Sequence, residues 1–171
     1  MTYLLTALGV IWRLLPHWPN FVPIGAIGIF SSNKQGIIKA SLTLILIMVL
    51  SDIFLGFSFV SIFVYVGMLT YIFWGRLTKK GWWGIAAPIG GSMSFFIISN
   101  LGVWLSPWYT HDLSGLIKCF TLAIPFYKFT LLSDIIFTAV LFGTSILVEK
   151  FKKGELKWHI KLPKVSLSKK S

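Results

Sequence analysis

Six side chains that stand in mostly apolar surroundings are of types that could bind a small molecule. They are His17, Asn20, Asp52, Asn100, Trp104 and Asp134. Carboxylate, amide and imidazole groups form hydrogen bonds or ion pairs, and an indole ring can stack on a flat ligand. A polar group in an apolar segment costs free energy unless it has a partner or faces a cavity. The sequence therefore predicts a ligand-binding site if the fold gathers these residues.

Asp134 is the strongest of the six candidates. Thr130, Asp134 and Thr138 are spaced by four residues, so they share one helical face, which Ser145 continues. A carboxylate in a membrane helix costs ~2.5–3.5 kcal/mol on insertion scales, so this polar face should meet protein or a cavity instead of lipid. Two interpretations stay open. Asp134 contacts a ligand, or Arg13 and Asp134 form a structural ion pair.

The other candidates have structural interpretations as well. Asp52 precedes the turn at 56–58, which could lift it into water, and Arg13 is better explained as a partner for an acid than as a ligand contact. His17 and Asn20 lie in a proline-rich loop that could hold them over a cavity or leave them in water. Asn100 could form a hydrogen bond between helices, worth about 1 kcal/mol.

Metal, nucleophile and nucleotide sites are not predicted. The histidines at 17, 111 and 159 are far apart, and Cys119 is the only cysteine, so no metal cluster or intrachain disulfide is expected. No glycine loop that could cradle phosphate precedes a lysine. We expect no cofactor, no nucleic-acid partner and no enzymatic activity.

The elements that position these residues must be membrane helices. Only Asp52 is charged between Lys39 and Arg76, and no residue is charged between Lys80 and Asp112. Charged residues make up 12% of the chain, against ~25% in an average soluble domain. A bilayer core about 30 Å thick requires about 20 apolar residues per helix, and these runs match that length.

The pattern predicts an all-α polytopic membrane protein with about six transmembrane helices, some of them short or re-entrant. Prolines at 16, 19 and 23 separate the first two helices, which are short. The segment 116–126 is apolar but too short to span, so we expect an interfacial or re-entrant helix there. A bundle over residues 1–148 and a basic tail over 149–171 complete the predicted organisation. The expected helices cover 3–15, 23–32, 37–55, 59–74, 82–105 and 129–148.

The distribution of basic residues predicts the orientation. Eight of the sixteen lysines and arginines lie in residues 149–171, and five more lie in the loops after the second and fourth helices. The opposite side holds three basic and three acidic residues. By the positive-inside rule, the basic side and both termini are cytoplasmic. Seven polar residues then lie near the outer face, namely His17, Asn20, Asp52, Asn100, His111, Asp112 and Asp134. Membrane lipid is an expected partner.

Four stretches resemble an uncharacterised family of small multi-pass bacterial membrane proteins. They are residues 13–26, Ser51-Asp52 with Leu55-Gly56, residues 100–104, and residues 124–126 followed by 130–134. The resemblance covers most of the chain up to Gly143 and leaves out the basic tail. It implies a bacterial inner-membrane location and carries no activity.

The chain is more distantly similar to the substrate-binding subunits of energy-coupling factor vitamin transporters. That similarity implies six helices, both termini inside, an outward-facing vitamin site and a lid in the first loop. It also implies a partner, an ATP-driven energy-coupling module that docks on an Ala-x-x-x-Ala patch of the first helix. Here Ala7 is followed at i+4 by Ile11, so the patch is absent.

Three functions are compatible with the sequence. The first is a solute-binding or transport subunit whose ligand enters from outside, beneath the loop at 16–21. The second is a structural or assembly protein without a ligand, whose tail docks on a membrane-protein partner or anionic lipid. The third and weakest is an intramembrane enzyme, which needs Asp52 and Asp134 close together with a shared proton. An outward cavity lined by Asp134 and Asn100 favours the first function, and a filled bundle with Asp134 bonded to Arg13 favours the second.

Overall fold

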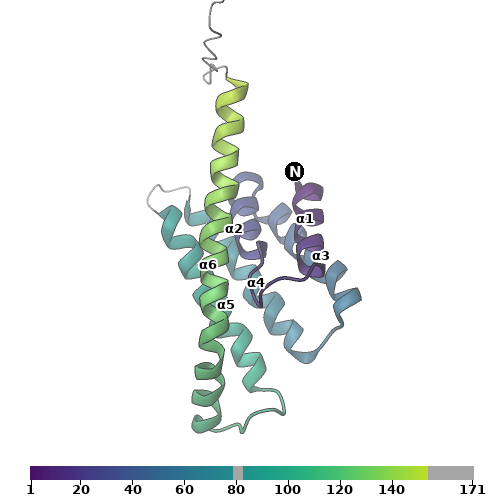
Figure 1. The fold of residues 1–171 in the computed structure, drawn as a ribbon, viewed down its shortest axis with the longest axis vertical. Helices are drawn as coiled ribbons and strands as arrows, with labels where there is room; N and C mark the ends of the chain where they lie inside the picture. The colour runs from purple at the N-terminus through teal and green to yellow at the C-terminus, as the bar shows by residue number, and fades with distance from the viewer. Residues whose placement is uncertain (79–82, 154–171) are drawn as a thin grey trace, which may run out of the picture.

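A computed structural model describes residues 1–78 and 83–153, and these residues fold into six helices without a strand. Successive helices run in opposite directions (Figure 1). The helices are α1 (Thr2–Leu14), α2 (Ile24–Gln35), α3 (Ile37–Leu55), α4 (Phe59–Leu77), α5 (Trp83–Trp104) and α6 (Leu113–Lys152). The predicted all-helical class is confirmed. The predicted tail lies outside the described residues from 154 onward.

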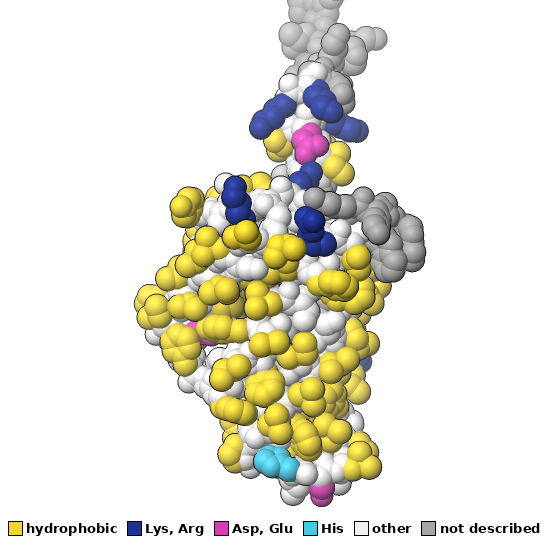
Figure 2. Space-filling view, turned by 180° about the vertical axis from the view of Figure 1, so that it is seen from behind, with side chains coloured by type: hydrophobic (Ala, Val, Ile, Leu, Met, Phe, Trp, Pro, Cys, Tyr) yellow, Lys and Arg dark blue, Asp and Glu magenta, His cyan; other side chains and the backbone are white. Residues whose placement is uncertain are grey.

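Four helices are long and apolar enough to cross a membrane within the described residues, namely α3, α4, the 86–104 part of α5, and α6. Large apolar side chains point outward from them, with Ile38 85% exposed and Phe54 76% exposed. Yellow apolar side chains are spread over the whole height of the bundle on the face that Figure 2 shows. A soluble monomer rarely exposes apolar surface on this scale. The protein is therefore an integral membrane protein.

The short helix α2 forms the centre of the bundle, because every residue from Ile24 to Ser32 is buried. Small residues let its neighbours approach closely. A Cβ atom at Gly75 of α4 would lie 2.5 Å from the carbonyl oxygen of Ile29. The hydroxyl of Ser32 donates a 2.6 Å hydrogen bond to the carbonyl of Ile72, which joins α2 to α4 a second time.

Helix α6 is continuous, so the prediction of a separate interfacial or re-entrant segment at 116–126 is wrong. Pro125 lies inside the helix, and the aromatic ring of Phe96 on α5 packs against residues on both sides of it. Its centroid lies 5.5 Å from that of Phe120 and 4.8 Å from that of Tyr127. These contacts hold the two halves in line despite the hydrogen bond that proline removes.

The beginning and length of α6 follow from local chemistry. The carboxylate of Asp112 caps the helix by accepting a 2.7 Å hydrogen bond from the backbone N–H of Gly115. Hydrogen bonds from Gly115 and Thr110 lower the pKa of Asp112. Forty residues make a helix about 60 Å long, twice the thickness of the bilayer core. The end of α6 therefore projects beyond the bundle (Figure 1).

One end of the bundle, which we call the basic end, gathers the N-terminus and the end of α6. Thr2 donates a 2.6 Å hydrogen bond to Gln35, and the amine of Lys34 lies 2.9 Å from the carboxylate of Glu149. Lysine and arginine side chains cluster where α6 leaves the bundle (Figure 2). We call the opposite end, with the loops at 56–58 and 105–112, the loop end.

Candidate functional site

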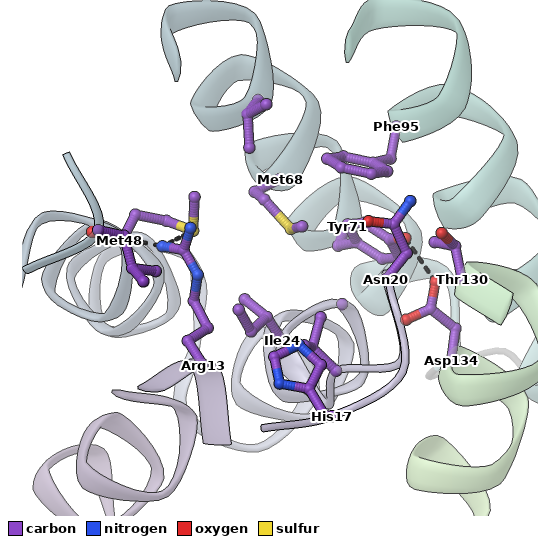
Figure 3. Close-up of a pocket in the computed structure, with 14 residues that line it drawn as sticks. Arg13, His17, Asn20, Ile24, Met48, Met68, Tyr71, Phe95, Thr130 and Asp134 are labelled. Atoms are coloured by element: carbon purple, nitrogen blue, oxygen red, sulfur yellow. Dashed lines mark hydrogen bonds between the residues drawn. The ribbon is translucent and has the colours of Figure 1, made fainter. Parts of the chain in front are cut away.

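A cavity of about 430 Å³ lies beside the first residues of α2 and the loop that precedes it. Helices α1 and α2, of thirteen and twelve residues, are only about 20 Å long, so they stop short of the loop end (Figure 1). Side chains from the longer helices surround the space (Figure 3). Its size is typical of sites for small molecules. Its polar lining residues are Arg13, His17, Asn20, Tyr71, Thr130 and Asp134.

Asp134 forms one polar wall of the cavity together with Tyr71. The carboxylate oxygen Oδ2 accepts a 2.5 Å hydrogen bond from the hydroxyl of Tyr71. Asp134 is 1% exposed and Tyr71 is fully buried. A Cβ atom at Gly25 would collide with both side chains. The absence of a side chain at position 25 therefore leaves the room in which they meet.

Arg13 lies on the opposite side of the cavity (Figure 3) and belongs to a separate ionic group. Its Nη1 lies 2.8 Å from Oδ1 of Asp52 and 2.6 Å from Oγ of Ser51. The other carboxylate oxygen of Asp52 accepts a 2.7 Å hydrogen bond from the hydroxyl of Tyr65. The structure thus pairs Arg13 with Asp52. The alternative interpretation, in which Arg13 pairs with Asp134, is wrong. Asp134 has Tyr71 as its partner.

The loop between α1 and α2 supplies His17 and Asn20. Nδ1 of His17 donates a 2.6 Å hydrogen bond to the carbonyl of Leu15, which fixes the proton on that nitrogen because a carbonyl only accepts. Asn20 has φ of 61°, and no other non-glycine residue in the described ranges has a positive φ. The indole nitrogen of Trp12 donates to the carbonyl of Phe21 at 3.1 Å. The loop is thus tied to α1 and holds its two polar side chains at the cavity.

A second cavity of about 200 Å³ adjoins the first and shares four lining residues with it, Asn20, Val64, Phe95 and Thr130. Asn100 lines this second space, although its amide nitrogen donates to the carbonyl of Phe96 in its own helix, 2.8 Å away. Trp104 lines neither space, and its indole nitrogen donates to the carbonyl of Thr110 at 3.0 Å.

The six candidate residues therefore divide into three groups. His17, Asn20 and Asp134 line the main cavity, and Asn100 lines the adjoining one. Asp52 does not line the main cavity, but it forms an ion pair with Arg13, which does. Trp104 stands in the loop region at the end of α5, with its ring 5.9 Å from that of His111.

Sequence reasoning missed the residues that shape the main cavity from α4 and α5. Tyr71 and Met68 of α4 and Phe95 of α5 line it. Aromatic and apolar residues are common throughout these helices, so their type gave no signal. One signal was available for Tyr71. A buried carboxylate needs a hydrogen-bond donor, and the hydroxyl of a tyrosine in a neighbouring helix is such a donor.

With this geometry established, the comparisons with known proteins place the chain. Residues 1–156 match a family of unknown function, DUF6580. The chain belongs to this family. The match confirms the resemblance to an uncharacterised family and extends it beyond Gly143. Neither a curated protein nor a solved structure matches the chain, so nothing supports the distant similarity to vitamin transporters.

Proposed function

We propose that this DUF6580 protein is a small-solute-binding or transport subunit of the bacterial inner membrane with an outward-facing site. The observation that carries the proposal is the 430 Å³ cavity whose walls combine a buried carboxylate, an arginine and an asparagine with aromatic rings. Protein interiors are close-packed, and a buried acid in a membrane protein is costly. A purely structural role for Asp134 would therefore leave the cavity beside it unexplained.

An outward orientation of the cavity follows from the positive-inside rule. Lys34 in the last turn of α2, and Lys150 and Lys152 in the last turn of α6, lie at the basic end. If this end is cytoplasmic, both termini and the basic tail are inside. The short helices α1 and α2 then leave the cavity on the outer side.

A cysteine-labelling experiment tests this orientation. Lys39→Cys and Trp108→Cys place single exposed thiols at the basic end and the loop end, in a background in which the buried Cys119 is replaced by Ser. In intact cells, an impermeant thiol reagent should label position 108, and it should label position 39 only after permeabilisation. The reverse pattern would overturn the orientation.

We assign no catalytic step to the protein. An intramembrane enzyme would need Asp52 and Asp134 to share a proton, but each carboxylate has its own tyrosine, Tyr65 and Tyr71 respectively. No hydrogen bond joins the two acids in the described part of the chain.

The binding function is tested by thermal melts in detergent with and without a small-molecule extract of the native cells. The extract should raise the melting temperature of the wild type. Asp134→Asn should melt near the wild type without extract, because an amide oxygen can still accept the hydrogen bond from Tyr71. It should lose most of the stabilisation by the extract.

Asp112→Asn is the matched control, because it makes the same change at the exposed cap of α6, away from the cavity. It should respond to the extract as the wild type does. If the extract stabilises none of the three proteins, or all of them equally, the binding site does not lie at Asp134.

A further inference from the structure

The buried acid of the main cavity, Asp134, takes part in neither ion pair of the described residues. The ion pairs in residues 1–78 and 83–153 join Arg13 to Asp52 and Lys34 to Glu149. Asp134 therefore has no cationic partner among the described residues, although its side chain is buried. An unpaired carboxylate in a membrane protein is costly, and such a group marks a functional site by default.

The nearest charged lining residue is already neutralised. Nη1 of Arg13 contacts Oδ1 of Asp52 at 2.8 Å, and Figure 3 places Arg13 and Asp134 on opposite sides of the space. The imidazole of His17 also lines the cavity, and its Nδ1 is hydrogen-bonded to the carbonyl of Leu15. Neither residue forms an ion pair with Asp134.

Asp134 has an acceptor left for a ligand. Oδ2 accepts the hydrogen bond from Tyr71, whereas Oδ1 accepts none from the described residues. Oδ1 faces Gly25, where a Cβ atom would collide with it. Because position 25 is a glycine, no side chain there collides with Oδ1, and both residues line the cavity.

Two aromatic rings line the same cavity as this acceptor. Tyr71 and Phe95 both line the cavity, with ring centroids 6.3 Å apart. The face of an aromatic ring attracts a cation within about 6 Å, most strongly where water is excluded. A carboxylate next to such rings is the arrangement that recognises an ammonium group.

From this arrangement we infer that the cavity binds a small organic cation, a protonated amine whose nitrogen contacts Oδ1 of Asp134. The carbon skeleton of the amine lies against Tyr71, Phe95 and Met68. This inference rests on the proposed function, because it specifies the ligand of the same site. The bound amine supplies the cationic partner that Asp134 lacks among the described residues.

Matched probes that share a hydrocarbon group and differ in the charge of the attached polar group test the inference. Three series suffice: butylamine, 1-butanol and pentanoate; phenethylamine, 2-phenylethanol and 3-phenylpropanoate; tryptamine, tryptophol and indole-3-propanoate. Affinities are measured at pH 7 on purified protein in detergent, by thermal shift and by calorimetry. In at least one series the amine should bind about tenfold more tightly than the alcohol, which is about 1.4 kcal/mol, and the carboxylate should bind least.

Asp134→Asn should remove the advantage of the amine over the alcohol, and Asp112→Asn should keep it. Three results would overturn the inference: equal binding of amine and alcohol in every series, tighter binding of a carboxylate, or an amine advantage that survives in Asp134→Asn. Absence of binding by all nine probes would overturn it too. If the cell extract still stabilises the wild type in that case, the proposed binding function stands and only the ligand class is wrong.

Discussion

The Asp52→Asn variant is expected to lose about 3 kcal/mol of its free energy of unfolding, because it leaves Arg13 partly buried without its counter-charge. The side chains of Arg13 and Asp52 are only 18% and 5% exposed, and their atoms lie 2.8 Å apart. The free energy is measured by detergent titration in mixed micelles.

A double-mutant cycle separates this ion pair from the cavity acid. Arg13→Gln with Asp52→Asn should be milder than Asp52→Asn alone, because a buried pair removed together can be nearly neutral. Arg13→Gln with Asp134→Asn should be additive within about 0.5 kcal/mol, as expected for groups that share no partner. Strong coupling in the second pair and none in the first would reverse the assignment.

The Gly75→Ala variant is expected to lose about 3 kcal/mol or to fail to fold, because its methyl group would overlap the backbone of α2. The added Cβ would lie 2.5 Å from the carbonyl oxygen and 2.7 Å from the Cα of Ile29. Backbone atoms cannot turn aside as a flexible side chain can, so α2 and α4 would have to separate. The yield of folded protein and its melting temperature measure the effect.

Gly143→Ala is the matched control for this substitution. A Cβ atom at Gly143 of α6 has no neighbour within 4 Å. Alanine is up to about 1 kcal/mol more favourable than glycine inside a helix, so this variant should match or exceed the stability of the wild type. Equal losses in the two variants would show that the approach of α2 to α4 does not control stability.

The sequence predicted the bounds of a helix well where glycines flank an apolar run. The third helix has the predicted bounds, 37–55, because glycines at 36 and 56 stand at its two ends, both with positive φ. The prediction of a separate short segment at 116–126 failed, because α6 runs without a break through Pro125. A proline is a local signal for a helix end, but the packing of Phe96 on both sides of it comes from another helix and cannot be seen locally.

The candidate site was predictable only in part for the same reason. Asp134, Asn20 and His17 were recognisable because polar residues in or beside apolar segments are rare. The partner of each acid depends on which helices are neighbours, and spacing within one helix does not encode this. Arg13 therefore pairs with Asp52 across α1 and α3, while Tyr71 reaches Asp134 from α4.

The account is tested most directly by native mass spectrometry of the protein purified from its own membranes in mild detergent. Val64 lines both cavities, whereas Val66 on the same helix is 50% exposed on the outer surface. Wild type and Val66→Trp should each carry a bound small molecule, and Val64→Trp should have lost it because the indole fills the cavity. A bound molecule that persists in Val64→Trp, or a wild type that carries none, would contradict a solute-binding cavity and favour a purely structural role.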